Sequence, residues 1–241
     1  IKQEPNMIKN IIRRGLTTLS ATVKIDPIQE ASLKETCILV NDQDEVIGNA
    51  SKRDCHLVLP NGDIPLHRAF SVFLFNTKGE LLLQKRSDTK ITFPGHFTNT
   101  CCSHPLIDFY EEREEKDAIG VKLAAQRRLY HELGIPKEMI ILDDFIYLTR
   151  ILYKSVGDGI WGEHEIDYIL VLIKDLPIHP NPEEVSETLY ISKDNFYEFL
   201  HNIRAPITPW FSLVTQKKLN IWWNNLDKLD KFQDHVNIHN F

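Results

Sequence analysis

The pattern of hydrophobic and polar positions along the chain predicts strands on both sides of a central helix. Several apolar runs are short and bounded by turn signals, which is typical of strands linked as hairpins. The run at residues 117–133 instead repeats its apolar positions at helical spacing. The predicted elements are a short helix at 27–36, a hairpin at 36–50, strands at 68–75 and 80–86 that pair with each other, the helix at 117–133, strands at 145–153 and 162–173, and helices at 193–201 and 208–223.

The central helix has recognisable start and stop signals. Asp117 is a plausible N-cap, and Gly134 with Pro136 ends the helix. Because strands precede and follow this helix and many are hairpin-linked, we expect a mixed α/β domain of the α+β type rather than a doubly wound parallel sheet. The apolar stripe of the helix consists of Ala118, Val121, Ala125 and Leu129.

Composition and charge narrow the class of protein. The chain has 241 residues, which corresponds to one large domain or one domain with extensions. Hydrophobic residues make up 42% and charged residues 26%, as in ordinary soluble globular proteins. The net charge of -6 argues against a general nucleic-acid binder, which needs a basic face, but allows a local pocket for one small anion. Since no apolar run approaches membrane-spanning length, we expect no membrane span.

The N-terminal region differs from the rest of the chain. Residues 7–23 carry basic and hydroxyl side chains, and no carboxylate lies between Glu4 and Asp26. A mitochondrial transit peptide has this composition, and a disordered basic tail explains it equally well. We expect a flexible extension at 1–26. The cysteines, Cys37, Cys55, Cys101 and Cys102, contain no Cys-x-x-Cys pair and predict free thiols in an intracellular, cytoplasmic protein, with mitochondrial targeting as the alternative.

The stretch 98–105 concentrates reactive side chains. It contains thiols, hydroxyls, an amide and an imidazole, but no large apolar side chain. Loops that carry such groups between ordered elements are common functional sites. The plain alternative is a polar loop in which two cysteines happen to be neighbours.

Carboxylates recur at alternate positions in the predicted strand 162–173. Side chains alternate between the two faces of a strand, so Glu163, Glu165 and Asp167 share one face. Neighbouring carboxylates repel unless a metal ion or a shared proton relieves them. A solvent-facing acidic edge is the alternative.

Three histidines could complete a metal site with these carboxylates. Each lies near polar or small neighbours rather than in a helical apolar stripe. A mixed set of imidazoles and carboxylates suits a transition metal such as Zn or Mn better than Ca. Because a single histidine is usually an ordinary surface or core residue, spacing alone supports this site weakly. The histidines are His56, His67 and His104.

Several cations could form an anion pocket. Arg128 and Glu132 are four residues apart on the predicted helix, where they form a surface ion pair or face a pocket. Lys52, Arg86 and Lys90 add positive charge near the stretch 98–105. In an acidic protein this grouping indicates a specific anion site, and two phosphates would suit it.

The run 91–106 resembles the catalytic cysteine segment of type I isopentenyl-diphosphate isomerases, and the eukaryotic branch fits best. The resemblance extends from residue 33 to 232, with separate motifs in the same order and with compatible spacing. The other matching runs are 66–75, 126–135, 159–168 and 207–210.

The resemblance implies a Nudix-like fold with a degenerate Nudix box. Nudix hydrolases carry Arg-Glu-x-x-Glu-Glu-x-Gly, whereas the matching run at 127–134 keeps Glu132 as its only glutamate. Because hydrolases use these glutamates to gather divalent metals, their loss argues against pyrophosphate cleavage. The implied segments are the extension 1–26, an N-terminal extension of the catalytic domain at 27–66, a Nudix-like catalytic domain at 67–201, and a C-terminal helical extension at 202–241.

The resemblance also implies a role for each matching residue. Cys102 and Glu165 would be the catalytic acid and base, in an order that stays open. Nearby cations or the metal site are expected to give Cys102 partial thiolate character. Tyr153 and Trp210 would lie beside the hydrocarbon. The other implied residues are Lys52, Arg86, Lys90, Ser103 and Arg128 for the diphosphate, Glu132 for a Mg²⁺ shared with it, and His56, His67, His104, Glu163 and Glu165 for a second divalent metal, which would be Mg²⁺, Mn²⁺ or Zn²⁺.

The implied activity is isomerisation of isopentenyl diphosphate and dimethylallyl diphosphate by protonation and deprotonation, which supplies isoprenoid and sterol synthesis. The partner would be a small isoprenoid diphosphate and no nucleic acid, and we expect a monomer. A Nudix pyrophosphohydrolase and a non-catalytic binding protein on the same scaffold are the alternatives. The degenerate box argues against the first, and the presence of Cys102 and Glu165 argues against the second.

Overall fold

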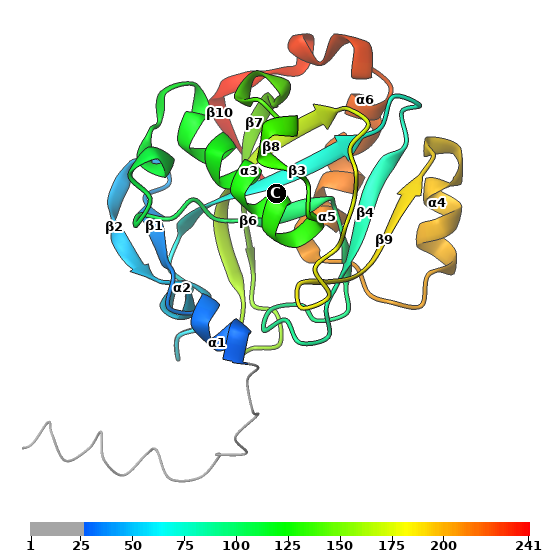
Figure 1. The fold of residues 1–241 in the computed structure, drawn as a ribbon. Coiled ribbons are helices and arrows are strands. Elements are labelled where there is room, and N and C mark those ends of the chain that lie inside the picture. Colours follow the sequence, from blue (N-terminus) through cyan, green and yellow to red (C-terminus); the bar gives the residue numbers. More distant parts are fainter. Residues whose placement is uncertain (1–26) are drawn as a thin grey trace, which may run out of the picture.

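The computed structural model describes residues 27–241, in which one mixed sheet carries helices on both faces (Figure 1). The predicted extension at 1–26, with its possible transit peptide, lies outside the described residues. The strands are β1 (Thr36–Val40), β2 (Val46–Ser51), β3 (His67–Phe75), β4 (Leu81–Arg86), β5 (Phe97–Thr98), β6 (Cys101–Ser103), β7 (Ile146–Ser155), β8 (Glu163–Ile173), β9 (Val185–Ile191) and β10 (Asp234–Asn240).

The helices differ widely in length. The longest is α3 (Ile119–Leu133), which ends at the left-handed Gly134 as predicted. The others are α1 (Pro27–Ser32), α2 (Lys52–His56), α4 (Lys193–Asn202), α5 (Pro209–Val214) and α6 (Asn220–Trp223), and a π-helical stretch, Thr215–Leu219, joins α5 to α6. None of the helices from residue 27 onward is long and apolar enough to cross a membrane.

Strand β3 lies at the centre of the sheet. It pairs in parallel with β8 along its whole length, starting with His67 opposite Glu165. Its other edge meets β1, β6 and β4 in succession. Every residue of β3 is buried, as expected for a strand that is covered on both faces. This strand therefore forms the rigid base on which the neighbouring segments meet.

Two hydrophobic cores fill the space between the sheet and its helices. Helix α3 packs its buried stripe, including Val121, Ala125 and Leu129, on one face. Helices α5 and α6 cover the opposite face with Phe211, Trp222 and other large side chains. Figure 1 shows this arrangement, with α3 in front of the sheet and α5 beyond it. The predicted apolar stripe of the central helix is thus confirmed.

Several predicted elements form, but some details of the prediction were wrong. The predicted β3–β4 hairpin pairs only at Phe75 and Leu81, and β4 runs along β9 instead. The reason is that β6 already occupies the edge of β3 at Phe70–Val72. The stretch 98–105 is not simply a loop, since β5 and β6 include part of it.

Asp117 does not cap the central helix. Its backbone is left-handed, with φ of 52°, and its side chain makes no cap hydrogen bond. The carbonyl of Glu114 accepts from the Gly120 N–H instead, so backbone takes the place of the predicted side chain.

Strand β10 was not predicted at all. The segment from Pro209 to Phe232 is mostly helical, but β10 then pairs in parallel with β7. Strands β1 and β2 likewise join the same sheet as the central strands. The division of the chain into the segments 27–66, 67–201 and 202–241 stays a prediction.

Candidate active site

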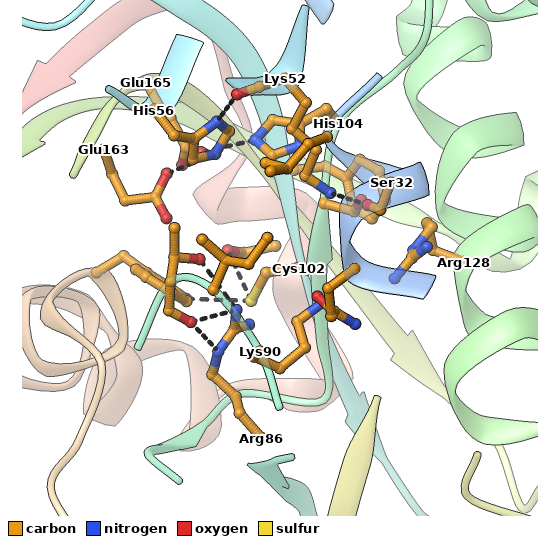
Figure 2. Close-up of a pocket in the computed structure, with 18 of the residues that line it drawn as sticks. Ser32, Lys52, His56, Arg86, Lys90, Cys102, His104, Arg128, Glu163 and Glu165 are labelled. Carbon is orange, nitrogen blue, oxygen red and sulfur yellow. Dashed lines mark hydrogen bonds and ion pairs between the residues drawn. The ribbon is translucent and has the colours of Figure 1, made fainter. Parts of the chain in front are cut away.

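A pocket beside β3, β6 and β8 brings together most of the predicted site residues. Figure 2 shows His56, His104, Glu163 and Glu165 on one side, Arg86 and Lys90 on the other, and Cys102 between them. The predicted residues that line the pocket are Lys52, His56, Arg86, Lys90, Cys102, Ser103, His104, Arg128, Tyr153, Glu163, Glu165 and Trp210. His67 and Glu132 are buried in contact with lining residues rather than in the lining itself.

The three histidines and two glutamates form one buried cluster. One ligand atom from each of the five residues lies within 4.8 Å of the others. His104 Nε2 is 2.9 Å from Glu165 Oε1, and His56 Nε2 is 3.0 Å from Glu163 Oε2. Backbone carbonyls fix two of the rings, since Nδ1 of His56 bonds to Lys52 O and Nδ1 of His67 to Pro65 O. These bonds direct both Nε2 atoms into the cluster.

The pairing of neighbouring strands explains why this cluster forms. The parallel register of β3 and β8 places His67 beside Glu165. Glu163 and Glu165 share a face of β8 with Asp167, as predicted, while His164 lies on the other face and bonds to Ile64 O. The alternative of a solvent-facing acidic edge is wrong, because Glu163, Glu165 and Asp167 are all buried.

The electrostatics of the cluster are unbalanced without a cation. Burial and the charge of His67 lower the pKa of His56 to about 3. Burial alone would lower the pKa of His67, but the hydrogen bond and charge of Glu165 raise it to about 9. Burial and the charge of Glu165 also raise the pKa of Glu163 well above its usual value. A divalent ion would relieve this carboxylate repulsion, and imidazole and carboxylate are suitable donors for it. The residues therefore fit a metal.

The two predicted acid–base residues approach the same pocket from different strands. Glu165 Oε2 accepts a short hydrogen bond from the Tyr153 hydroxyl. The Cys102 S–H donates to Asn99 Oδ1 at 3.0 Å, and the Trp210 indole N–H donates to Cys102 Sγ at 3.1 Å. The adjacent thiol of Cys101 instead belongs to the core beneath α3.

The expectation that nearby cations or the metal site give Cys102 partial thiolate character stays a prediction, and the protein groups around the sulfur oppose it. Burial and the neighbouring Asp167 raise the pKa of Cys102 to about 12. The positive charge of Arg86 opposes this shift but does not reverse it. Asn99 presents its carbonyl oxygen to the sulfur, which also favours the protonated thiol. Sequence reasoning assigned no role to Asn99, whose only signal was its place in the reactive stretch.

Cationic side chains occupy the other side of the pocket. The pair formed by Arg128 and Glu132 is buried, so the alternative of a surface ion pair is wrong. Lys52 lies 3.6 Å from Glu35 and donates to Ser32. Arg86 donates to the carbonyl oxygens of residues 92 and 93 and lies 5.8 Å from the Trp210 ring centroid.

One buried residue of this region, Glu184, was missed by the sequence analysis. Its carboxylate lies 2.7 Å from the Lys90 ammonium and 3.1 Å from the Arg128 guanidinium. It belongs to the loop before β9, which is far from both cations in the sequence. No local pattern around Glu184 could have identified it.

Comparisons with known proteins agree with this geometry. Residues 65–211 match the NUDIX domain family. The chain is 52% identical over 224 residues to isopentenyl-diphosphate Delta-isomerase 1 of Mesocricetus auratus, covering 90% of this chain and 97% of that protein. It is 47% identical over 226 residues to isopentenyl-diphosphate Delta-isomerase II of Camptotheca acuminata, covering 89% and 72%.

Solved structures show the same fold. The crystal structure of DR0079 from Deinococcus radiodurans superposes with a TM-score of 0.54 at 18% identity, covering 76% of this chain and 99% of that one. The predicted mixed sheet with flanking helices is therefore confirmed as a Nudix fold. Together, the matched domain and the relatives that align over most of the chain show that this protein belongs to the NUDIX family and to the isopentenyl-diphosphate Delta-isomerases.

Proposed function

We propose that this protein interconverts isopentenyl diphosphate and dimethylallyl diphosphate, and so supplies isoprenoid synthesis. The relatives from Mesocricetus auratus and Camptotheca acuminata, which are 52% and 47% identical to this chain, are named for that reaction. The observation that carries the proposal is the pair formed by Cys102 and Glu165, which line one pocket with buried cations beside them.

The reaction moves a double bond by a 1,3-proton shift. One proton adds to the terminal alkene carbon, and another leaves the carbon next to the CH₂O group. Such a shift needs one group that holds a proton and one that can take it. Burial raises the pKa of the Cys102 thiol, whereas the hydrogen bond from His104 and the charge of His67 outweigh burial and hold the pKa of Glu165 well below its usual value. With this pairing, Cys102 would give the first proton and Glu165 would take the second in one direction of the reaction, and the two roles would be exchanged in the reverse direction.

The positive charge that develops on the substrate needs a neighbour that does not react with it. Trp210 is 4% exposed and lines the pocket beside Cys102. An aromatic face attracts a cation by about 2 kcal/mol when it is desolvated. Tyr153, which is also buried, bonds to Glu165 and helps keep water away from the reacting carbons.

Two metal ions complete the proposal. His56, His67, His104, Glu163 and Glu165 would hold a divalent transition metal such as Zn²⁺ or Mn²⁺, although their donor set also accepts Mg²⁺. Bound there, the ion would neutralise the carboxylates and tune the acidity of Glu165. Glu132 would hold a Mg²⁺ shared with the diphosphate. Lys52, Arg86, Lys90, Ser103 and Arg128 would contact the diphosphate itself.

The setting of the protein is part of the proposal. All four cysteines are free, as expected in a reducing compartment. We expect the protein to act as a monomer in the cytoplasm, or in mitochondria if residues 7–23 direct it there. Its partner would be the small isoprenoid diphosphate and no nucleic acid.

The test is incubation of the purified protein with isopentenyl diphosphate and Mg²⁺, followed by NMR and a phosphate assay. The expected result is formation of the dimethylallyl isomer without release of phosphate. Phosphate release without the isomer would instead indicate a hydrolase. Substrate binding without either product would indicate a protein that only binds the diphosphate.

A further inference from the structure

Glu184 is a buried carboxylate that the proposed reaction does not use. It is 4% exposed and ends the loop that precedes β9. Its N–H donates to Asn181 O, and its own carbonyl accepts from Ser87 N–H at 3.0 Å. Asn181 in turn donates to the carbonyl of Glu132 in α3. These bonds hold Glu184 between the C-terminal half of α3 and the segment that follows β4.

The carboxylate oxygens of Glu184 face four side chains. Oε2 lies 2.7 Å from Lys90 Nζ and 3.1 Å from Arg128 Nη2. Oε1 lies 3.4 Å from His131 Nε2 and accepts from Gln29 of α1 at 3.4 Å. Lys90 and Arg128 line the pocket, whereas Glu184 is outside its lining. Glu184 therefore contacts the two cations from the side away from the pocket and does not occupy the space that a ligand would fill.

Lys90 is the cation that depends most on this partner. Its side chain is 10% exposed, and burial together with the charges of Arg86, Lys52 and Arg128 lowers its pKa to about 8. Arg128 does not need a carboxylate partner to keep its charge, because a guanidinium stays charged in proteins. Among the groups around Lys90, Glu184 and the more distant Glu132 are the carboxylates that favour its charge. His131 approaches Glu184 from its other side.

We propose that Glu184 is a positioning residue that acts through Lys90, keeping the Lys90 ammonium charged and directed into the diphosphate end of the pocket. This inference rests on the proposed function, which places the diphosphate beside Lys90. Without Glu184 the ammonium would lose its ion pair while three cations and burial still oppose its charge. Lys90 would then release its proton at a lower pH, and the pocket would lose a phosphate contact in the neutral to alkaline range.

The test measures binding of inorganic pyrophosphate by calorimetry, at constant Mg²⁺, from about pH 6.5 to about pH 9. The variant is Glu184→Gln, which keeps the shape of the side chain and removes its charge. The measured quantity is the ratio of its Kd to the wild-type Kd, in which the titration of pyrophosphate itself cancels. If the pKa of Lys90 falls by about one unit, this ratio rises by up to about tenfold across the range. At about pH 6.5 Lys90 is charged in both proteins, so the ratio of the two Kd values stays near one or below it.

Glu183→Gln is the matched control, since it removes the same charge from the neighbouring residue, whose carbonyl bonds to Thr89. Its ratio should not change with pH. A ratio for Glu184→Gln that is flat with pH would show a merely structural role and overturn the inference, as would an equal trend in Glu183→Gln.

Lys90→Arg provides a second test that leaves Glu184 in place. A guanidinium stays charged throughout this range, so the affinity lost by the wild type above about pH 8 should be retained in this variant. An unchanged alkaline loss in Lys90→Arg would overturn the inference. Failure of the wild type to bind pyrophosphate at any pH would overturn the placement of a diphosphate beside Lys90 and, with it, this inference, whereas the proposed function is tested separately by turnover of isopentenyl diphosphate. A wild type that binds while the variants show no pH-dependent difference would overturn the inference alone.

Discussion

The pocket has two ends of different charge, a histidine end formed by imidazoles and carboxylates and a cationic end formed by lysine and arginine side chains. At the histidine end, Glu163 and Glu165 meet three imidazoles, and no lysine or arginine pairs with these carboxylates in the part of the chain that the structure describes. At the cationic end, Lys90 and Arg128 already have buried carboxylate partners in Glu184 and Glu132. The donors of the first end fit an added cation, whereas the second end carries cationic side chains whose charge is already partly balanced by carboxylates. The difference indicates which ligand each end takes.

The two ends also differ in how they are built. Adjacent strands β3, β6 and β8, with α2, supply the histidine end, so strand register sets its geometry. The cationic end collects single side chains from α2, β4, α3 and the segment after β4. A sheet holds its side chains more rigidly than connecting segments do. We therefore expect changes near the sheet to have larger effects than changes among the cations.

The largest loss of turnover is expected from changes to the two proposed proton-transferring residues, Cys102 between the two ends and Glu165 at the histidine end. Cys102→Ala and Glu165→Gln should each lower kcat by about 10³-fold, because each removes a group that transfers a proton. Turnover of isopentenyl diphosphate is the measurement, with circular dichroism to confirm folding. Cys101→Ala is the matched control, since that thiol packs in the core and should leave kcat nearly unchanged. Comparable kcat in Cys102→Ala and the wild type would remove Cys102 from the mechanism.

An intermediate loss of turnover is expected from changes at the histidine end. His104→Ala removes an Nε2 that lies 2.9 Å from Glu165, so the purified protein should carry much less transition metal, with a corresponding loss of turnover. Elemental analysis measures the metal content. His164→Ala is the control, because this neighbouring histidine lies on the opposite face of β8 and bonds to Ile64 O. Equal metal content in His104→Ala and His164→Ala would contradict the site.

The smallest effect on catalysis, a rise in KM, is expected from changes at the cationic end. Arg128→Lys keeps a positive charge but loses the planar fork that now bonds to Glu132 and Glu184, so KM should rise by about tenfold and kcat should change less. Steady-state kinetics with isopentenyl diphosphate measure both constants. Metal content at the histidine end should stay at the wild-type value. A fall in metal content in Arg128→Lys would show that the two ends are not independent.

Short-range patterns in the sequence predicted most of the elements correctly. The alternation of Glu163, Glu165 and Asp167 and the helical stripe of α3 both held, because each depends only on the geometry of one element. The resemblance supplied the candidate catalytic residues, and the structure brings Cys102 and Glu165 into one pocket. The cap at Asp117 failed, because the carbonyl of Glu114 reaches the start of the helix from outside it.

Long-range pairing accounts for what the sequence could not predict. Strand β4 had a suitable turn for pairing with β3, but β6 occupies that edge. Strand β10 is polar and half exposed, and its partner β7 lies far away in the chain. The direction of the pKa shift of Cys102 could not be predicted for a similar reason, since burial among distant segments outweighs one nearby cation.

The sequence by itself determined most of the elements, the family and the list of candidate site residues, because these depend on local spacing and on motifs read in order. Only the tertiary structure decided how those side chains are charged and paired. Burial and long-range contacts raise the pKa of Cys102, unite five candidate metal ligands in one cluster, and place the Glu184 carboxylate next to the Lys90 ammonium. These properties depend on distances through space and on the exclusion of water, and neither can be calculated from the order of the residues alone.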